Sequence, residues 1–118
     1  MRGVANKWEY KQYHISVRLT GNEYQEVLDF CKRKGIVPSV ALRMAIRELY
    51  FDTDSRLFME PGYLKKVVRE KANRTVILRT RIDENMQDNL SYCMINRHGK
   101  NKSELIADSL LRLCRNQQ

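Results

Sequence analysis

The chain contains an internal repeat, and this repeat constrains the fold more than any other feature of the sequence. The segment GIVPSVALRMAIREL (residues 35–49) aligns with GKNKSELIADSLLRL (residues 99–113), and both begin with Gly-x-x-x-Ser. Small or apolar residues then coincide at four aligned positions: Leu42/Ile106, Ala45/Ser109, Ile46/Leu110 and Leu49/Leu113. They follow the spacing that places side chains on one face of a helix. Because one such helix cannot bury its apolar face alone, we expect the two copies to face each other.

A second helical pattern precedes each of the two glycines. Its apolar face comprises Tyr24, Val27, Leu28 and Cys31 in the first copy and Met86, Leu90, Cys93 and Met94 in the second. The sequence also marks where the helices begin and end. The residues typical of helix starts are Thr20 with Glu23, Asp83, Asn101 with Glu104, and Pro38. Gly35 and Gly99 suit the left-handed position that ends a helix.

A run of alternating apolar and polar residues precedes each pair of helices. HISVRL (14–19) and TVILRTRI (75–82) both alternate, which is typical of a strand with one buried and one open face, and both carry arginine on the polar side. Each copy therefore predicts a strand, a helix, a short turn and a helix. The predicted segments are an N-terminal arm (1–13), a first unit (14–51), a linker (52–74) and a second unit (75–115).

The linker predicts a short basic helix, because Tyr63, Leu64, Val67 and Val68 follow one another at amphipathic spacing. About 23 residues reach up to roughly 75 Å when extended, so the two units can pair within one chain or between chains. The basic residues of the linker suit a solvated face and a phosphate contact equally; they are Lys65, Lys66, Arg69 and Lys71. The aromatic residues of the arm are expected to pack on the core rather than to stack on a partner; they are Trp8, Tyr10 and Tyr13.

The charge of the chain favours an anionic partner. The 118 residues carry a net charge of +8, with a pI near 9.6. For a short chain this balance indicates nucleic acid ahead of a membrane or an acidic protein. No apolar run approaches the length that spans a membrane, so we expect no membrane partner.

Cysteine, histidine and serine usage argues against a metal or catalytic site. The three cysteines lie in helical apolar patterns without a CxxC spacing, which predicts reduced thiols in the core of a cytoplasmic protein. His14 and His98 have no partners at metal-ligand spacing. Ser39 and Ser103 have no base and no orienting group. We therefore expect no metal, no cofactor and no enzymatic activity.

Two strand-helix-helix units with these signatures resemble the ribbon-helix-helix (Arc/MetJ-type) family of DNA-binding proteins. The second unit, RTRIDENM (79–86) followed by GKNKSELIADSLLRL, is the closer match. The first unit has one additional residue between strand and helix, and it carries Val37-Pro38 where a polar cap is usual. The resemblance implies a mainly α fold with a short antiparallel two-stranded β-ribbon. In that fold, two tandem units pair as a pseudo-dimer within one chain or between chains.

The resemblance also implies which side chains contact DNA. Alternate residues of the ribbon face the bases of the major groove, and here these are His14, Ser16, Arg18, Ile77, Arg79 and Arg81. The inward residues are Ile15, Val17, Leu19, Val76, Leu78, Thr80 and Ile82. The start of the second helix in each unit faces a phosphate, and the residues implied are Ser39, Val40, Lys100, Lys102 and Ser103. The chemistry agrees, since arginine is the usual bidentate reader of guanine and a helix N-terminus favours an anion.

We therefore expect sequence-specific binding of double-stranded DNA. Tandem units of this size resemble the TraY-type accessory proteins of conjugative plasmid relaxosomes, which bind near a transfer origin. This is the leading expectation, with a relaxase or another relaxosome protein as a further candidate partner. A transcriptional repressor and an antitoxin-like interaction module are the alternatives. Because the two strands carry different base-facing residues, a ribbon formed within one chain need not read a palindromic site.

Overall fold

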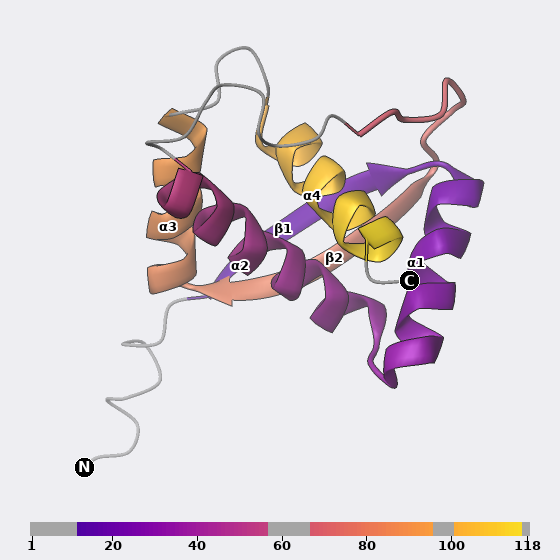
Figure 1. The fold of residues 1–118 in the computed structure, drawn as a ribbon, viewed down its shortest axis with the longest axis horizontal. Coiled ribbons are helices and arrows are strands. Elements are labelled where there is room, and N and C mark those ends of the chain that lie inside the picture. Colours follow the sequence, from indigo (N-terminus) through magenta and orange to yellow (C-terminus); the bar gives the residue numbers. More distant parts are fainter. Residues whose placement is uncertain (1–11, 57–66, 96–100, 117–118) are drawn as a thin grey trace.

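The computed structural model describes residues 12–56, 67–95 and 101–116, in which four helices and two strands alternate in the order βααβαα. Figure 1 shows α2 and α4 lying across one face of the ribbon, with α1 and α3 at its two ends. The elements are β1 (Gln12–Leu19), α1 (Gly21–Lys34), α2 (Pro38–Arg56), β2 (Val76–Asp83), α3 (Glu84–Ile95) and α4 (Lys102–Asn116). The expected mainly helical fold with a two-stranded antiparallel sheet is thereby confirmed.

The two strands pair with each other along their whole length. β1 and β2 are antiparallel, from Gln12 opposite Asp83 to Leu19 opposite Val76. Their side chains alternate between a buried and an exposed face, as the sequence pattern predicts. The inward residues Ile15, Val17, Leu19, Leu78, Thr80 and Ile82 are buried, and Val76 is half-buried. One face of the ribbon is therefore part of the core, and the other is open.

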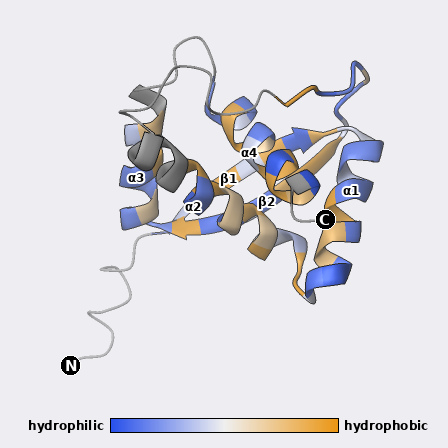
Figure 2. Ribbon diagram, viewed as in Figure 1, coloured by the Kyte–Doolittle hydropathy of each residue, from blue (hydrophilic) through white to orange (hydrophobic). Residues whose placement is uncertain are grey.

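The helices that cover the ribbon meet through the faces defined by the repeat. All eight residues at the four aligned positions are buried. The Ser109 hydroxyl donates a hydrogen bond of 2.7 Å to the Ala45 carbonyl, so two residues at equivalent positions of the repeat are in direct contact where α2 meets α4. Figure 2 shows that α1 is amphipathic as well: its hydrophobic side faces α4 and its outer side is hydrophilic.

The first helical pattern of each unit also lies where predicted. Val27, Cys31, Leu90 and Cys93 are buried, Tyr24 and Met86 are partly buried against the core, and Leu28 is half-buried, whereas the side chain of Met94 lies outside the described residues. The three cysteines are buried and form no disulfide, which confirms their predicted place in the core. Burial raises the pKa of the Cys114 thiol to about 12, and therefore this thiol stays protonated at neutral pH.

Helix ends follow the sequence signals closely. Thr20 and Glu23 form a reciprocal capping box at the start of α1, with bonds of 3.1 and 2.9 Å between each backbone N–H and the other side chain. The Asp83 carboxylate accepts from the Met86 N–H at 2.8 Å and caps α3. Gly35 ends α1 with φ 69°, a conformation that costs glycine little. Gly99 lies outside the described residues.

The linker differs from the expectation. α2 continues to Arg56, beyond residue 51, where we expected the linker to begin. Residues 67–75 form neither helix nor strand, so the predicted linker helix does not include Val67 or Val68. Tyr63 and Leu64 lie outside the described residues. Val68 is 83% exposed, and an isolated exposed valine does not stabilise an amphipathic helix.

The last two residues of the expected arm, Gln12 and Tyr13, belong to the ribbon. β1 begins at Gln12, and Tyr13 is half-buried against the core, as expected for this aromatic residue. Trp8 and Tyr10 lie outside the described residues. Within the described part of the chain, the length and hydropathy of every helix fall short of what crossing a bilayer requires.

The pairing of β1 with β2 predicts a monomer. Both strands belong to one chain, so light scattering at low protein concentration should give the mass of one chain, 14.0 kDa, independent of concentration. A dimer that persists on dilution would contradict this prediction, because it would indicate strands exchanged between two chains.

Candidate nucleic-acid interface

The six residues expected to read bases lie together on the open face of the ribbon. All six are exposed, and the strand register places them directly opposite one another in three neighbouring pairs. The pairs are His14 with Arg81, Ser16 with Arg79, and Arg18 with Ile77. We call these six residues the reading face. Alternation fixes which side of the ribbon each residue occupies. A shift of either strand by one residue would therefore turn the side chains of that strand away from this face.

Each pair of the reading face contains one arginine and one smaller or uncharged partner. Arg79 and Arg81 come from β2, whereas Arg18 comes from β1. Residues two apart on one strand are separated by about 6.6 Å, close to two steps of about 3.4 Å along a nucleic-acid strand. Ile77 is 42% exposed and presents an apolar side chain on this face. The face therefore offers regularly spaced cationic donors and one apolar contact.

The start of α2 offers fewer backbone donors than the resemblance implies. Pro38 has no N–H, and the Val40 N–H donates to the Val37 carbonyl at 3.0 Å. Val40 therefore does not present its backbone N–H as a phosphate donor. Ser39 keeps its backbone N–H and its hydroxyl, and it is half-buried at this helix start.

The start of α4 is better formed. The Asn101 side chain accepts from the Glu104 N–H at 2.8 Å and donates to the Glu104 carboxylate at 2.7 Å. This cap leaves the Lys102 and Ser103 N–H groups of the first turn for another partner, and Lys102 is exposed. Lys100 lies outside the described residues.

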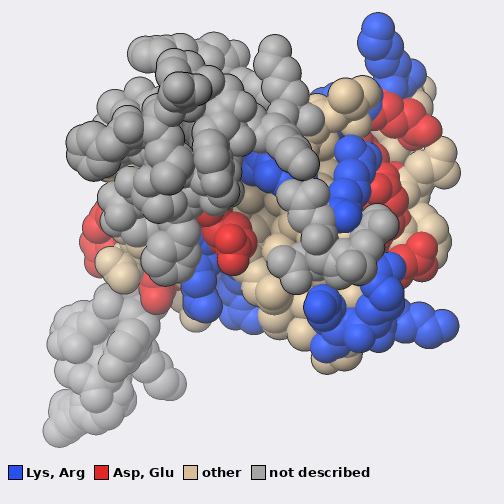
Figure 3. Space-filling model, viewed as in Figure 1, with Lys and Arg blue, Asp and Glu red and all other residues tan. Residues whose placement is uncertain are grey.

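A basic cluster that the sequence patterns did not single out lies at the end of α1. Lys32, Arg33 and Lys34 form the last turn of α1 and are all exposed. Figure 3 shows Lys and Arg side chains gathered at the end of the molecule where α1 gives way to α2. Three consecutive cations were visible in the sequence, but at the end of a helix they also complement the helix dipole, so their position alone carries no assignment.

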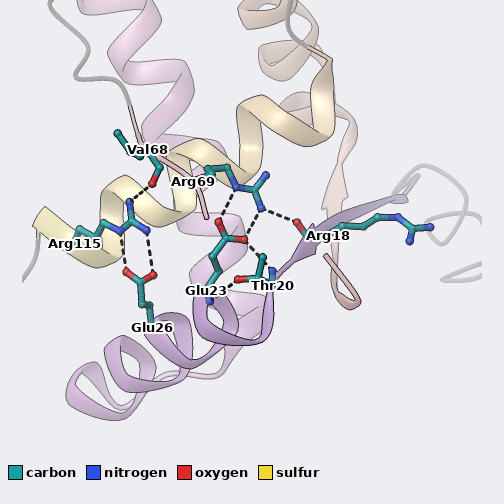
Figure 4. Close-up of polar contacts among 7 residues, drawn as sticks. All are labelled: Arg18, Thr20, Glu23, Glu26, Val68, Arg69 and Arg115. Atoms are coloured by element: carbon teal, nitrogen blue, oxygen red, sulfur yellow. Dashed lines mark hydrogen bonds and ion pairs between the residues drawn. The ribbon is translucent and has the colours of Figure 1, made fainter. Parts of the chain in front are cut away.

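Arg69 is not a solvated linker residue. Its guanidinium donates to both carboxylate oxygens of Glu23, from Nε at 2.9 Å and from Nη2 at 2.7 Å. Nη2 also donates to the Arg18 carbonyl at 2.9 Å (Figure 4). The side chains of Arg69 and Glu23 are only 9% and 1% exposed. Of the other linker cations, Lys71 is exposed, and Lys65 and Lys66 lie outside the described residues.

The surrounding groups lower the pKa of Glu23. Burial acts to raise it, but hydrogen bonds from Arg69 and from the Thr20 backbone, with the charges of Arg69 and Arg74, outweigh that effect. Sequence reasoning identified Glu23 only as a capping residue. Nothing in the sequence connects positions 23 and 69, which meet only because the linker returns to the start of α1.

Two further contacts hold the same part of the linker, and we call residues 68–70 the linker strap. Arg115 of α4 donates to the Glu26 carboxylate at 2.8 and 3.1 Å and to the Val68 carbonyl at 3.1 Å. The Asn22 side chain donates to Glu70 at 2.7 Å. The linker strap is therefore bonded to both α1 and α4 beside the end of β1.

The described residues contain no cluster of three or more His, Cys, Asp or Glu side chains that could hold a metal ion. His14 belongs to the reading face, opposite Arg81, and His98 lies outside the described residues. Comparison of the chain with protein-family models, with curated proteins and with solved structures gives no match.

The Glu23–Arg69 pair predicts a specific dependence of stability on pH. Because folding lowers the pKa of Glu23 below its ordinary value, the stabilising contribution of the pair is complete well above that ordinary value and is lost as pH falls through the folded pKa. Glu23→Gln should cost about 3 kcal/mol at pH 7, since it leaves Arg69 without its counter-charge. Urea unfolding followed by circular dichroism should show that the variant loses less stability than wild type between pH 6 and pH 3, roughly the range over which a carboxylate of lowered pKa protonates.

Glu26→Gln is the matched control for this experiment. It removes the more exposed pair with Arg115, whose side chains are 33% and 39% exposed, and should cost at most about 1 kcal/mol. Equal losses for the two variants, or a Glu23→Gln curve parallel to that of wild type, would contradict the prediction.

Proposed function

We propose that the protein binds double-stranded DNA in a sequence-specific manner, through the reading face placed in the major groove, and that it has no catalytic activity. The observation that carries this proposal is the strand register, which gathers three arginines and three partners on one open face. A two-stranded ribbon fits the major groove of B-form DNA, which is about 12 Å wide. The net charge of +8 also supports an anionic partner, because an exposed strand face with another role does not require such a charge.

The side chains of the reading face match the chemistry of base edges. Arg18, Arg79 and Arg81 can each donate two hydrogen bonds to guanine, and Ser16 can donate or accept. Ile77 can contact the methyl group of thymine. Phosphate contacts from Ser39, Lys102 and Ser103 would fix the register of the protein on the duplex without adding sequence information.

The proposed arrangement is a pseudo-dimer of two tandem ribbon-helix-helix units within one chain. Pairing of β1 with β2 and contact between the aligned residues Ala45 and Ser109 support it. A homodimer would place identical pairs at both ends of the reading face. Here one end carries His14 with Arg81 and the other carries Arg18 with Ile77, so the preferred DNA site is not palindromic.

The leading biological role is that of an accessory protein that binds a plasmid transfer origin within a relaxosome. A transcriptional repressor would use the same interface, and a footprint on plasmid DNA separates a transfer origin from a promoter. An antitoxin-like module would need a segment to bind its partner. The contacts of the linker strap with α1 and α4 count against the linker in that role.

Base reading by β2 can be tested with single substitutions. Arg79→Ala and Arg81→Ala should each cost about 1–3 kcal/mol on the preferred site, obtained by selection from random duplexes, and should relax base preference at one position. Arg47→Ala is the matched control, since Arg47 is an exposed arginine on α2, which packs on the opposite face of the ribbon. Equal losses on the preferred site and on random DNA would rule out base reading by these residues.

The contribution of phosphates should appear as salt dependence. The logarithm of the binding constant should fall with the logarithm of salt concentration, with a slope of about −0.9 for each phosphate contacted. Lys102→Ala should reduce this slope by about 1 on preferred and random DNA alike. Binding that does not change with salt would exclude DNA as the physiological partner.

A further inference from the structure

We propose that Arg69 is a positioning residue for DNA recognition, which holds the Arg18 end of the reading face without touching DNA itself. This inference rests on the proposed function, because it assigns Arg69 a part in the base preference of that face. Its effect is confined to one end of the DNA site, where Arg18 and Ile77 lie.

The geometry of Arg69 connects the backbone of β1 to the start of α1. The same guanidinium contacts both oxygens of Glu23 and the carbonyl of Arg18. A guanidinium is planar and its donors have fixed directions, so the bidentate contact with Glu23 determines where the third hydrogen bond points. Glu23 is in turn fixed by the Thr20 N–H, which donates to the same oxygen as Nη2. The Arg18 carbonyl is therefore held by groups that cannot move independently.

Arg18 needs such support because of its place in the ribbon. It stands one residue before the end of β1, and only Leu19 with Val76 lies beyond its pair. A two-stranded ribbon has two free edges and its ends open easily. Figure 4 shows the Arg18 side chain extending away from the cluster formed by Arg69, Glu23 and Thr20. Arg69 thus fixes the backbone of Arg18 and leaves its side chain available.

Arg69 itself starts from an anchored backbone. Arg115 binds the Val68 carbonyl on one side of it, and Asn22 binds Glu70 on the other. With its side chain 9% exposed, Arg69 is also unable to act as a phosphate contact while the ion pair is formed. A contribution of Arg69 to recognition must then act through Arg18.

Among the residues that the structure describes, no equivalent contact holds the opposite end of the reading face. In the structure the helix caps Thr20 and Asp83 directly follow Leu19 and Ile82, so the additional residue expected in the first unit is not present. Arg81 is therefore the equivalent of Arg18, and Met86 the equivalent of Glu23. Methionine cannot hold a guanidinium, and the Met86 N–H is bound by Asp83. A substitution at Arg69 should consequently alter one end of the DNA site and spare the other.

The test compares base-preference profiles of variants on a duplex library in which each position of the preferred site is randomised in turn. Arg18→Ala and Arg81→Ala first identify the base pairs read at each end. Arg69→Ala should then reduce discrimination at the Arg18 end by about fivefold or more, the lower bound of what one bidentate arginine contact contributes. Discrimination at the Arg81 end should stay within about twofold of wild type, the scatter expected between distant, independent sites.

Arg69→Lys separates positioning from stability. Lysine keeps a charge beside Glu23, but its three donors diverge from a single nitrogen and do not reproduce the planar fork that binds both carboxylate oxygens and the Arg18 carbonyl. Arg69→Lys should lose discrimination at the Arg18 end alone, while its stability stays closer to that of wild type. It replaces Arg69→Ala in the experiment if that variant does not fold. Arg115→Ala is the matched control, because it releases the linker strap at Val68 but keeps all three Arg69 hydrogen bonds and the anchor from Asn22 to Glu70. It should therefore change discrimination at either end by no more than about twofold.

The outcomes are distinguishable. A wild-type protein without base preference would overturn the proposed function, and this inference with it. A wild-type protein whose preference depends on Arg18 but is unchanged in Arg69→Lys would overturn this inference alone. Equal loss at both ends, or the same loss in Arg115→Ala, would also overturn it, because each would indicate a general effect of the linker strap on folding.

Discussion

The structure depends on covering one face of a two-stranded ribbon. Such a ribbon has no interior and is marginal in water unless its apolar face packs against something else. Here α2 and α4 supply that cover, and they contact each other where Ala45 meets Ser109. Neither unit of the repeat can provide both helices. Covering the inner face therefore forces the two halves of the chain together, and the same pairing creates the open outer face.

Much of this was predictable because it depends on local chemistry repeated twice. Alternation in the two strands determined which side chains are buried, and the capping residues Thr20, Asp83 and Asn101 hold the helix starts where the sequence indicated. Gly35 ends α1 in the left-handed conformation expected of it. Such features involve residues within a few positions of one another, so their physical signal is contained in a short segment.

What the sequence did not reveal depends on contacts between distant segments. The linker was expected to contain a short basic helix, yet residues 67–75 form neither helix nor strand, and residues 68–70 bond to α1 and α4. Buried ion pairs leave no periodic pattern. The use of the Val40 N–H by Val37 was equally hidden, since it depends on the local geometry of a helix start that has no polar cap.

The presence of both strands in one chain has a consequence for how specificity can change over time. In a ribbon built from two identical chains, one codon specifies two side chains, and any substitution alters both halves of the DNA site at once. Here each of the six residues of the reading face is encoded once and occurs once per ribbon. In the DNA-binding role that we propose, a single mutation can therefore change one end of the DNA site while the other end keeps its contacts, and successive variants can remain bound throughout.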